Sequence, residues 1–184
     1  RRDSNVKNIL VISTSLRPRS NSEALAGAFC AGAQAAGNRV EQVTLRDKTL
    51  AFCQGCLACQ RTRQCVIADD ARQITDKMGR AQVLVFATPI YYYEMSGQMK
   101  TLLDRANPLF ASDYAFRQVY LLTAAAEDGA EVPEKAVSGL QGWVDCFGKA
   151  ALAGTVFAGG VSGPGEMDGH PALQEAYRLG AAIR

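Results

Sequence analysis

Four of the six cysteines in this 184-residue chain lie close together, at the spacing C-x2-C-x2-C-x5-C. Cysteines this closely set differ from the dispersed pattern of a secreted disulfide framework, so they indicate metal or redox chemistry in a reducing compartment. Three interpretations stay open: ligands of a [4Fe–4S] cluster, ligands of a structural zinc ion, or metal-free thiols that pack or form a redox-active pair. The candidate metal ligands are Cys53, Cys56, Cys59 and Cys65.

A second candidate site is a loop rich in hydroxyl groups and arginine, residues 14–22, between an apolar run and a stretch of good helix formers. A helix N-terminus offers unpaired backbone N–H groups and the positive end of the helix dipole. A plain helix cap needs only one Ser or Asn, so this density of donors favours a phosphate site. The candidate phosphate-binding residues are Ser15, Arg17, Ser20, Asn21 and Ser22.

A third candidate is a loop with three consecutive tyrosines, after the apolar run 83–87. Pro89 is expected to end that strand, and a new helix is expected near Ser96 and Gly97. The tyrosines either cover an edge of the core or form a shelf for a flat aromatic ligand. The residues concerned are Pro89, Ile90, Tyr91, Tyr92, Tyr93, Ser96 and Gly97.

The elements that must position these loops alternate between strand and helix. Apolar or alternating runs predict strands at 8–13, 39–45, 83–87, 118–124 and 153–159. Helical patterns follow them at 23–36, 71–79, 98–106, 133–150 and 171–183. This order predicts one α/β domain over residues 1–184, with a parallel sheet covered by helices on both faces. The second strand alternates, which places it at or near a sheet edge.

In such sheets ligands bind beyond the carboxyl ends of the strands. The hydroxyl-rich loop, the tyrosine loop and the small residues after the fourth strand, Thr123 and Ala124, should therefore meet. A phosphate cradle beside an aromatic shelf suits FMN.

Because their neighbours are apolar, Cys30 and Cys146 are interpreted as buried structural thiols. His170 is interpreted as a surface residue and not as an acid catalyst.

Composition narrows the class of protein. The formal net charge is +2 and the basic residues are scattered, which argues against a nucleic-acid partner. No apolar run is long enough to span a bilayer, so no membrane partner is expected. The chain begins with Arg1 and not Met, so its true N-terminus stays open, and no signal peptide is evident. We expect small-molecule partners and a cytoplasmic location.

These motifs together resemble the flavodoxin-like NADPH-dependent FMN reductase family. Residues 14–22 look like its phosphate loop. Pro89-Ile-Tyr with Ser96-Gly97, Lys100 and Asp104-Arg105 looks like its flavin-ring loop and the helix that follows. The cysteine cluster with Asp69-Asp70 is similar to the branch called iron–sulfur flavoproteins.

The resemblance implies a flavodoxin-like three-layer sandwich with a five-stranded parallel sheet of order 2-1-3-4-5, and a homodimer or higher homo-oligomer. It implies that the candidate phosphate-binding residues of the 14–22 loop bind the FMN phosphate. It also implies that the candidate residues between Pro89 and Gly97 surround the flavin ring, with Thr123 and Ala124 at the other edge of the ring. The implied activity is an FMN-dependent NAD(P)H oxidoreductase that passes electrons to a quinone, azo, nitro or flavin acceptor. Since the flavin carries the chemistry, no catalytic side chain is assigned.

Two alternatives stay open. One is an iron–sulfur flavoprotein electron carrier with a [4Fe–4S] cluster on the four clustered cysteines. The other lies outside enzymes: a redox sensor in which thiols or a bound metal switch a binding surface.

Overall fold

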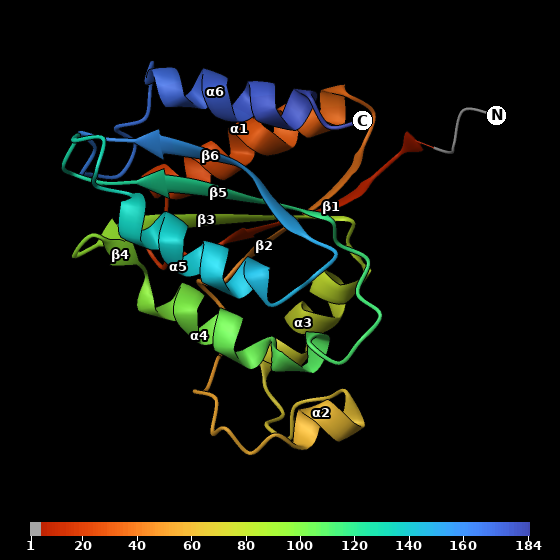
Figure 1. The fold of residues 1–184 in the computed structure, drawn as a ribbon. Coiled ribbons are helices and arrows are strands. Elements are labelled where there is room, and N and C mark those ends of the chain that lie inside the picture. Colours follow the sequence, from red (N-terminus) through yellow and green to blue (C-terminus); the bar gives the residue numbers. More distant parts are fainter. Residues whose placement is uncertain (1–4) are drawn as a thin grey trace.

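A computed structural model describes residues 5–184. Its sheet has the strand order β2–β1–β3–β5–β6, and all neighbours in this order are parallel (Figure 1). The long strands are β1 (Asn8–Ser13), β2 (Arg39–Thr44), β3 (Val83–Tyr91), β5 (Gln118–Ala124) and β6 (Ala151–Ala158). Counted without the short β4, this is the order 2-1-3-4-5. The prediction of a flavodoxin-like fold with β2 at a sheet edge is confirmed.

Helices cover both faces of the sheet. In Figure 1, α1 (Asn21–Ala35) and α6 (Pro171–Ala181) lie on one side, and α3 (Asp70–Arg80), α4 (Gly97–Arg105) and α5 (Glu134–Asp145) lie on the other. The strands feed two hydrophobic clusters with alternate side chains: Ile9 and Val11 join one, and Leu10 and Ile12 join the other. This is why their sequences read as continuous apolar runs. None of the helices in residues 5–184 is both long and apolar enough to cross a bilayer.

The predicted end of the third strand is wrong. Strand β3 continues past Pro89, which pairs with Ala124 of β5. The chain then turns back into the two-residue antiparallel strand β4 (Glu94–Met95). Proline lacks only the N–H donor, and its fixed φ is compatible with extended backbone at the end of a ladder. The tyrosines therefore belong to a β-hairpin and not to an open loop.

Other differences are smaller. A short helix α2 (Ala58–Thr62) within the cysteine segment and a 3-10 turn η2 (Asn107–Leu109) were not predicted. Helix α5 ends at Asp145, five residues earlier than expected. Cys30 is buried as expected, but Cys146 is exposed at the C-cap of α5, so its interpretation as a buried thiol was wrong.

Helices α1 and α6 pack unusually closely, through one glycine on each. A Cβ added at Gly32 would lie 2.0 Å from the Tyr177 carbonyl oxygen, and one added at Gly180 would lie 2.2 Å from the Phe29 carbonyl oxygen. Two helix backbones can approach this far only where neither residue carries a side chain. The contact holds α1, whose N-terminus faces the candidate site, against the C-terminal helix.

We predict that Gly32→Ala and Gly180→Ala each lower the free energy of unfolding by about 2–3 kcal/mol, because the added methyl group meets backbone that cannot move aside. Urea denaturation measures the change. Gly27→Ala is the matched control: it lies in the same helix with nothing within 4 Å of the added Cβ. That control should be neutral or stabilise by about 0.5–1 kcal/mol, and equal effects at all three positions would contradict the close-packing argument.

Candidate functional site

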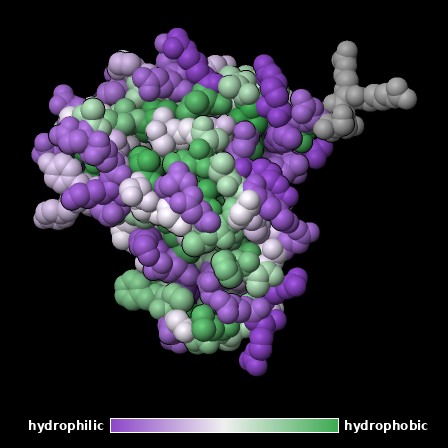
Figure 2. Space-filling model, viewed as in Figure 1, coloured by the Kyte–Doolittle hydropathy of each residue, from purple (hydrophilic) through white to green (hydrophobic). Residues whose placement is uncertain are grey.

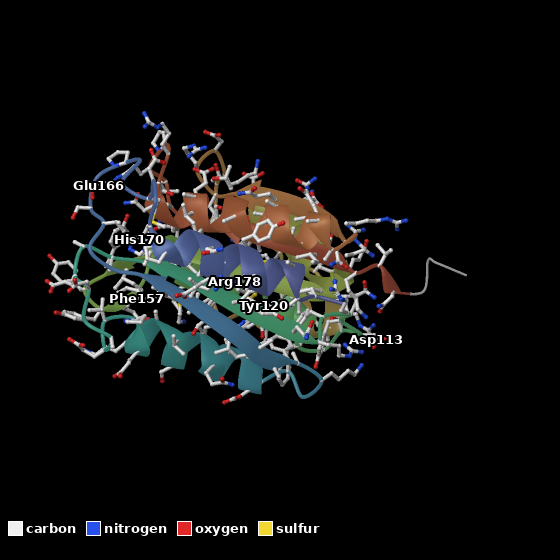
Figure 3. The ribbon with its side chains drawn as sticks, turned by 90° about the horizontal axis from the view of Figure 1, so that it is seen from above. Asp113, Tyr120, Phe157, Glu166, His170 and Arg178 are labelled. Carbon is white, nitrogen blue, oxygen red and sulfur yellow. The ribbon has the colours of Figure 1, made fainter. Side chains whose placement is uncertain are left out.

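A cleft of about 260 Å³ lies at the carboxyl ends of the strands, where the loops after β1, β3, β5 and β6 meet. Figure 3 shows Glu166 and His170 at this end of the molecule and Asp113 at the opposite end. The residues that line the cleft are Ser15, Arg17, Ser20, Asn21, Ser22, Pro89, Ile90, Tyr91, Ala124, Ala125, Ala126, Val161 and Ser162. The structure therefore brings together nine of the residues predicted from the sequence to bind a cofactor.

The hydroxyl-rich loop forms one wall of the cleft. Ser20 is the N-cap of α1, and its Oγ accepts a hydrogen bond from the Glu23 N–H at 3.1 Å. Ser15 and Ser22 are almost fully buried and still face the cleft. The other N–H groups of the first helical turn have no acceptor within the helix, as at any helix start. The wall thus combines hydroxyl and amide donors with the positive end of a helix.

Arg17 and Asn21 reach across to the loop after β6. Arg17 Nη1 donates to the Ser162 carbonyl at 2.5 Å, and Asn21 Nδ2 donates to the Gly163 carbonyl at 3.0 Å. The Oδ1 atom of Asn21 is buried and has no hydrogen-bond partner in the described part of the chain. A buried acceptor without a donor costs about 1–3 kcal/mol. Asn21 itself lines the cleft.

The opposite wall is apolar. Pro89, Ile90 and Tyr91 lie beside the small side chains of Ala124, Ala125 and Ala126, because Pro89 and Ala124 are partners on the neighbouring strands β3 and β5. Small apolar side chains next to a tyrosine ring give this wall a surface suited to a flat group. Tyr91 is 48% exposed, so its ring lies at the rim of the cleft and is not part of the core.

Tyr92 and Tyr93 do not line the cleft, although both were predicted to bind the cofactor. They form the two-residue turn of the β3–β4 hairpin, with φ of 50° and 64°. Such turns require positive φ at both positions, which is uncommon for bulky residues. Tyr92 is 99% exposed, and the ring of Tyr93 lies 5.9 Å from the Lys135 ammonium nitrogen.

Ser96, Gly97 and Thr123 also lie outside the cleft lining. Ser96 is fully buried as the N-cap of α4, and its Oγ lies 3.1 Å from Thr14 Oγ1. The Ser96 N–H donates to Thr88 Oγ1 at 3.0 Å. These hydroxyl groups join the phosphate-loop wall to the hairpin wall, so Ser96 supports the cleft from behind. Thr123 Oγ1 donates to the Val156 carbonyl within the sheet.

Four lining residues were not assigned to the cofactor from the sequence: Ala125 and Ala126, which belong to the small-residue turn predicted to meet the site, and Val161 and Ser162. Val161 and Ser162 could have been predicted from the sequence, because the loop after β6 also follows the carboxyl end of a parallel strand. His170 is half-buried and not a surface residue: Nδ1 accepts from the Ala172 N–H as the N-cap of α6, and Nε2 lies 3.0 Å from the Gly159 carbonyl. It anchors that loop.

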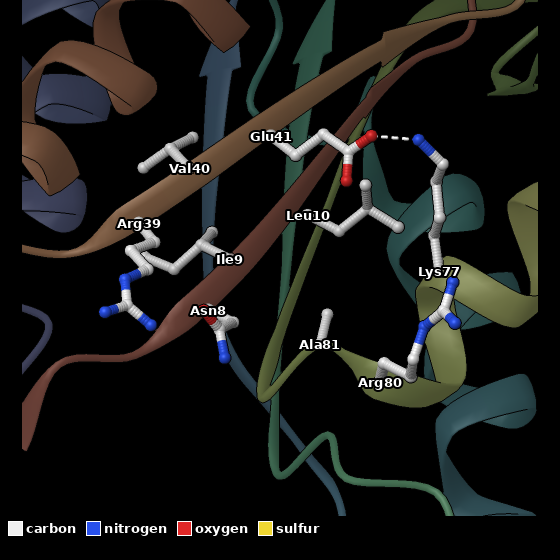
Figure 4. Close-up of a pocket in the computed structure, with 9 residues that line it drawn as sticks. All are labelled: Asn8, Ile9, Leu10, Arg39, Val40, Glu41, Lys77, Arg80 and Ala81. Atoms are coloured by element: carbon white, nitrogen blue, oxygen red, sulfur yellow. Dashed lines mark hydrogen bonds and ion pairs between the residues drawn. The ribbon is translucent and has the colours of Figure 1, made fainter.

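A separate hollow lies at the other end of the sheet, between the start of β1 and β2 and the end of α3 (Figure 4). Its volume is about 420 Å³, and Lys77 pairs with Glu41 across it. Its floor includes the apolar Ile9 and Leu10. None of the residues predicted for chemistry lines it, so the candidate site is the cleft at the carboxyl ends.

The cysteine segment lies between β2 and α3, on the α4 side of the sheet (Figure 1). All four clustered cysteines are free thiols and line one small, mostly apolar cavity of about 20 Å³. Two sulfurs accept hydrogen bonds: Cys59 from Asn107 Nδ2 at 3.2 Å, and Cys53 from the Gly55 N–H at 3.4 Å. Four thiols with N–H···S hydrogen bonds have the chemistry of an iron–sulfur ligand set.

The geometry of that cavity, as described, does not suit a metal ion or cluster. A volume of about 20 Å³ holds roughly one water molecule. Within residues 5–184, no group of three or more His, Cys, Asp or Glu side chains is arranged so that it could hold a metal ion. Closing four sulfurs on a cluster would therefore require the cysteine segment to change its conformation, which exposed positions such as Cys53 and Cys56 permit.

A buried ion pair lies beneath this segment. Asp69 caps α3, because its Oδ1 accepts from the Ala71 N–H at 3.1 Å. Sequence reasoning missed its second role: Arg105 donates to both carboxylate oxygens, at 2.7 and 2.8 Å, with its side chain fully buried. Burial raises the pKa of Asp69, but hydrogen bonds from Arg105 and from the Ala51 and Ala71 N–H groups outweigh it and hold that pKa below its usual value.

We predict that this ion pair makes stability fall at acidic pH. A depressed folded-state pKa contributes stability above the unfolded value of about 3.9, and the contribution is lost as pH falls through the folded value. Urea denaturation between about pH 7 and pH 2 should show a shallower pH dependence for Asp69→Asn than for wild type. At pH 7 the variant should lose about 3–5 kcal/mol, because Arg105 is left buried without its counter-charge.

The control is Asp113→Asn, which removes an exposed carboxylate that pairs with Lys149. Burial does not protect that pair, so little change in stability is expected. A pH profile of Asp69→Asn that matches wild type would contradict the role assigned to the buried pair.

The sheet order and the cleft at its carboxyl ends define a flavodoxin-like protein. Residues 7–160 match the family described as NADPH-dependent FMN reductase, and the chain belongs to this family. Family membership confirms the prediction of an NAD(P)H-dependent FMN oxidoreductase.

Related proteins identify the branch of the family to which the chain is most similar. An iron–sulfur flavoprotein from Methanosarcina thermophila is 29% identical over 161 residues, which cover 85% of this chain and 83% of that protein. Another, from Methanocaldococcus jannaschii, is 35% identical over 101 residues, which cover 55% of this chain and 52% of that protein. The predicted resemblance to the iron–sulfur flavoprotein branch is confirmed.

Solved structures share the fold. An NAD(P)H:quinone oxidoreductase from Methanothermobacter marburgensis has a TM-score of 0.74 at 18% identity, covering 97% of this chain and 96% of that one. An azoreductase from Bacillus anthracis has a TM-score of 0.70 at 18% identity, covering 96% of this chain and 99% of that one.

Proposed function

We propose that the cleft binds FMN and that the chain uses it to pass electrons from NAD(P)H to a small aromatic acceptor of the quinone, azo, nitro or flavin class. The observation that carries the proposal is the cradle at the start of α1. There, buried serine hydroxyls and the helix N-terminus line one cleft with Asn21, whose Oδ1 has no hydrogen-bond partner among the described residues. Donors suit a phosphate, and the Asn21 acceptor suits a hydroxyl of the ribityl chain.

Each part of the cleft has a role in this proposal. Bound FMN supplies the hydride and electron chemistry. Ser15, Arg17, Ser20, Asn21 and Ser22 hold the phosphate and ribityl end. The apolar wall that includes Tyr91 and Ala124 orients the ring and keeps water from its edge. The buried Ser96 and Thr123 support the walls from behind, and Tyr92 and Tyr93 offer an exposed aromatic surface for an acceptor beside the rim.

A second proposal concerns the cysteines. Four free thiols on one cavity, two of them already hydrogen-bonded, favour a [4Fe–4S] cluster on Cys53, Cys56, Cys59 and Cys65, which would make the chain an electron carrier between flavin and a protein acceptor. Relatives named iron–sulfur flavoproteins support this. Free cysteines also support a reducing location such as the cytoplasm.

We also propose that the chain forms a homodimer or higher homo-oligomer. Apolar side chains are exposed on the cysteine segment, where Phe52 is 80% and Leu57 57% exposed, and Figure 2 shows hydrophobic residues at that lower end of the molecule. Exposed apolar groups gathered on one segment are typical of a contact surface.

We predict that Arg17→Met weakens FMN binding by about tenfold or more and changes riboflavin binding by less than about threefold, since only FMN offers a phosphate to the guanidinium. Flavin fluorescence titration measures both. Lys48→Met is the control: it removes an exposed cation from the segment after β2 that does not line the cleft. Equal losses for FMN and riboflavin in Arg17→Met would show that the phosphate lies elsewhere.

The two electron-transfer proposals are separated by the protein purified and reconstituted without oxygen. We predict flavin absorption bands with an added broad shoulder, about four iron and four acid-labile sulfide per chain, and loss of the shoulder but not of the flavin in Cys59→Ala. Flavin bands without iron would leave the reductase and remove the iron–sulfur carrier. A colourless protein that refuses added FMN would remove both and favour a thiol- or metal-based sensor.

A further inference from the structure

The last strand of the sheet, β6, has an open edge. It ends the strand order on one side, and within residues 5–184 no strand pairs with its outer side. Figure 1 shows β6 with α6 above it and α5 below, and Figure 3 shows Phe157 toward its carboxyl end. An edge strand presents unpaired N–H and C=O groups, which can pair with a strand of another chain.

The ladder to β5 shows which backbone groups of β6 face outward. The Ala158 carbonyl accepts a hydrogen bond from the Ala125 N–H at 2.9 Å, so the backbone groups of Ala158 point toward β5. In a parallel ladder both groups of one residue point to the same side, and successive residues alternate. Because the register is regular from Gly154 to Ala158, Thr155 and Phe157 direct their N–H and C=O groups outward.

The two edges of the sheet differ in charge. Strand β2, at the opposite edge, includes Arg39 and Glu41 among its six residues. Charged side chains and proline on an edge strand discourage pairing with another chain. Strand β6 has the sequence ALAGTVFA, with neither a charged residue nor a proline, and its register shifts only before Gly154. The second half of β6 therefore lacks the features that block pairing, whereas β2 has them.

Basic side chains border the amino end of β6. The Ala151 N–H donates to the Arg117 carbonyl at 3.0 Å, which places Arg117 beside the first residue of the strand. Lys149 lies two residues before the strand, and Arg117 and Lys149 are both exposed. Lys149 pairs with the carboxylate of Asp113 at 2.9 Å. Two cations thus accompany one carboxylate, which leaves this end with excess positive charge.

Acidic side chains border the carboxyl end. The Gly160 N–H donates to the Glu127 carbonyl at 3.3 Å. A Cβ added at Gly159 would lie 2.6 Å from the Cα atom of Asp128, so the backbone of Asp128 lies directly against the end of β6. Glu127 and Asp128 are both exposed. The two ends of the open edge therefore carry charges of opposite sign.

We propose that the β6 edge is an interface with a second copy of this chain, in which two β6 strands pair antiparallel and join two sheets into one. Antiparallel pairing sets the basic end of each strand beside the acidic end of the other, whereas parallel pairing would set like charges together. A two-fold axis at Val156 brings Thr155 of one copy opposite Phe157 of the other, so that their outward backbone groups exchange hydrogen bonds.

This interface is separate from the contact surface proposed on the cysteine segment, because it uses different residues, and it does not depend on a bound cofactor. Together the two surfaces would give each chain two distinct contacts with other copies. A protein with two such contacts forms assemblies larger than a dimer.

Hydrogen exchange measured by NMR tests the pairing on wild-type protein. The Thr155 and Phe157 amides should exchange at least about tenfold more slowly than the outward amides of β2, because only the former are hydrogen-bonded to a second copy. The β2 amides to compare are Val40 and Gln42, since the Arg39 N–H donates to the Lys7 carbonyl and the next residues alternate. Equal exchange at both edges would overturn the proposal.

A charge at the edge tests the same contact by mass. Thr155→Lys adds a lysine at an exposed position of β6, so it should convert the assembly to a smaller one in sedimentation velocity and abolish the slow exchange of Phe157. Gln42→Lys is the matched control, because it adds the same charge to the exposed β2 edge and should leave the mass unchanged. An unchanged mass in Thr155→Lys, with circular dichroism confirming that it is folded, would overturn the proposal.

Mixed samples test the direction of pairing without any variant. When isotope-labelled and unlabelled wild-type chains are combined, a filtered NMR experiment should show contacts between the Thr155 methyl group of one copy and the Phe157 ring of the other. Wild-type protein that assembles without these contacts would overturn antiparallel pairing. Wild-type protein that sediments as a monomer at the same concentration would also overturn the proposal, and would leave the edge to an extended segment of a different protein.

The two contact surfaces fail separately. Phe52→Ser/Leu57→Ser removes exposed apolar groups of the cysteine segment and should leave the slow exchange of Thr155 and Phe157 intact. If that double variant lowers the mass of the assembly and Thr155→Lys does not, the β6 interface is wrong and the contact on the cysteine segment stands. The reverse result removes the contact on the cysteine segment and supports the β6 interface.

Discussion

The interaction on which this structure most depends is the burial of parallel strands on both faces. Because Ile9 and Val11 face one hydrophobic cluster and Leu10 and Ile12 face the other, β1 must be covered by helices on each side. Helical crossovers then bring every strand back in the same direction. All the loops at the carboxyl ends consequently meet at one edge, and the cleft forms there without any requirement that its lining residues attract one another.

A second constraint concerns polar groups placed behind that edge. The hydroxyls of Thr14, Thr88 and Ser96 connect the phosphate-loop wall to the hairpin wall within a fully buried region. Fully satisfied polar networks of this kind fix one arrangement of a core more strictly than apolar packing does. Hydrogen bonds among residues outside the cleft lining thereby hold the two walls in a fixed relation.

The cysteine segment follows a different logic from the cleft. It packs little apolar surface of its own and exposes Phe52 and Leu57, so its position depends on polar ties to α3 and α4. A buried pair such as Arg105 and Asp69 contributes specificity more than net stability, since removing the two charges together costs far less than removing one.

The sequence by itself determined the alternation of strands and helices, the three loops that meet and the chemistry each carries, because periodicity and donor type are local properties. The strand order was implied only by the resemblance to a known family. Only the tertiary structure decided which side chains face the cleft. Pro89 fitted an extended hairpin, so Tyr92 and Tyr93 turned outward while Tyr91 stayed at the rim. Likewise the pairing of Asp69 with Arg105, across 36 positions, depends on how α3 and α4 pack. The local sequence of either segment does not indicate which distant segment it will contact in the folded protein.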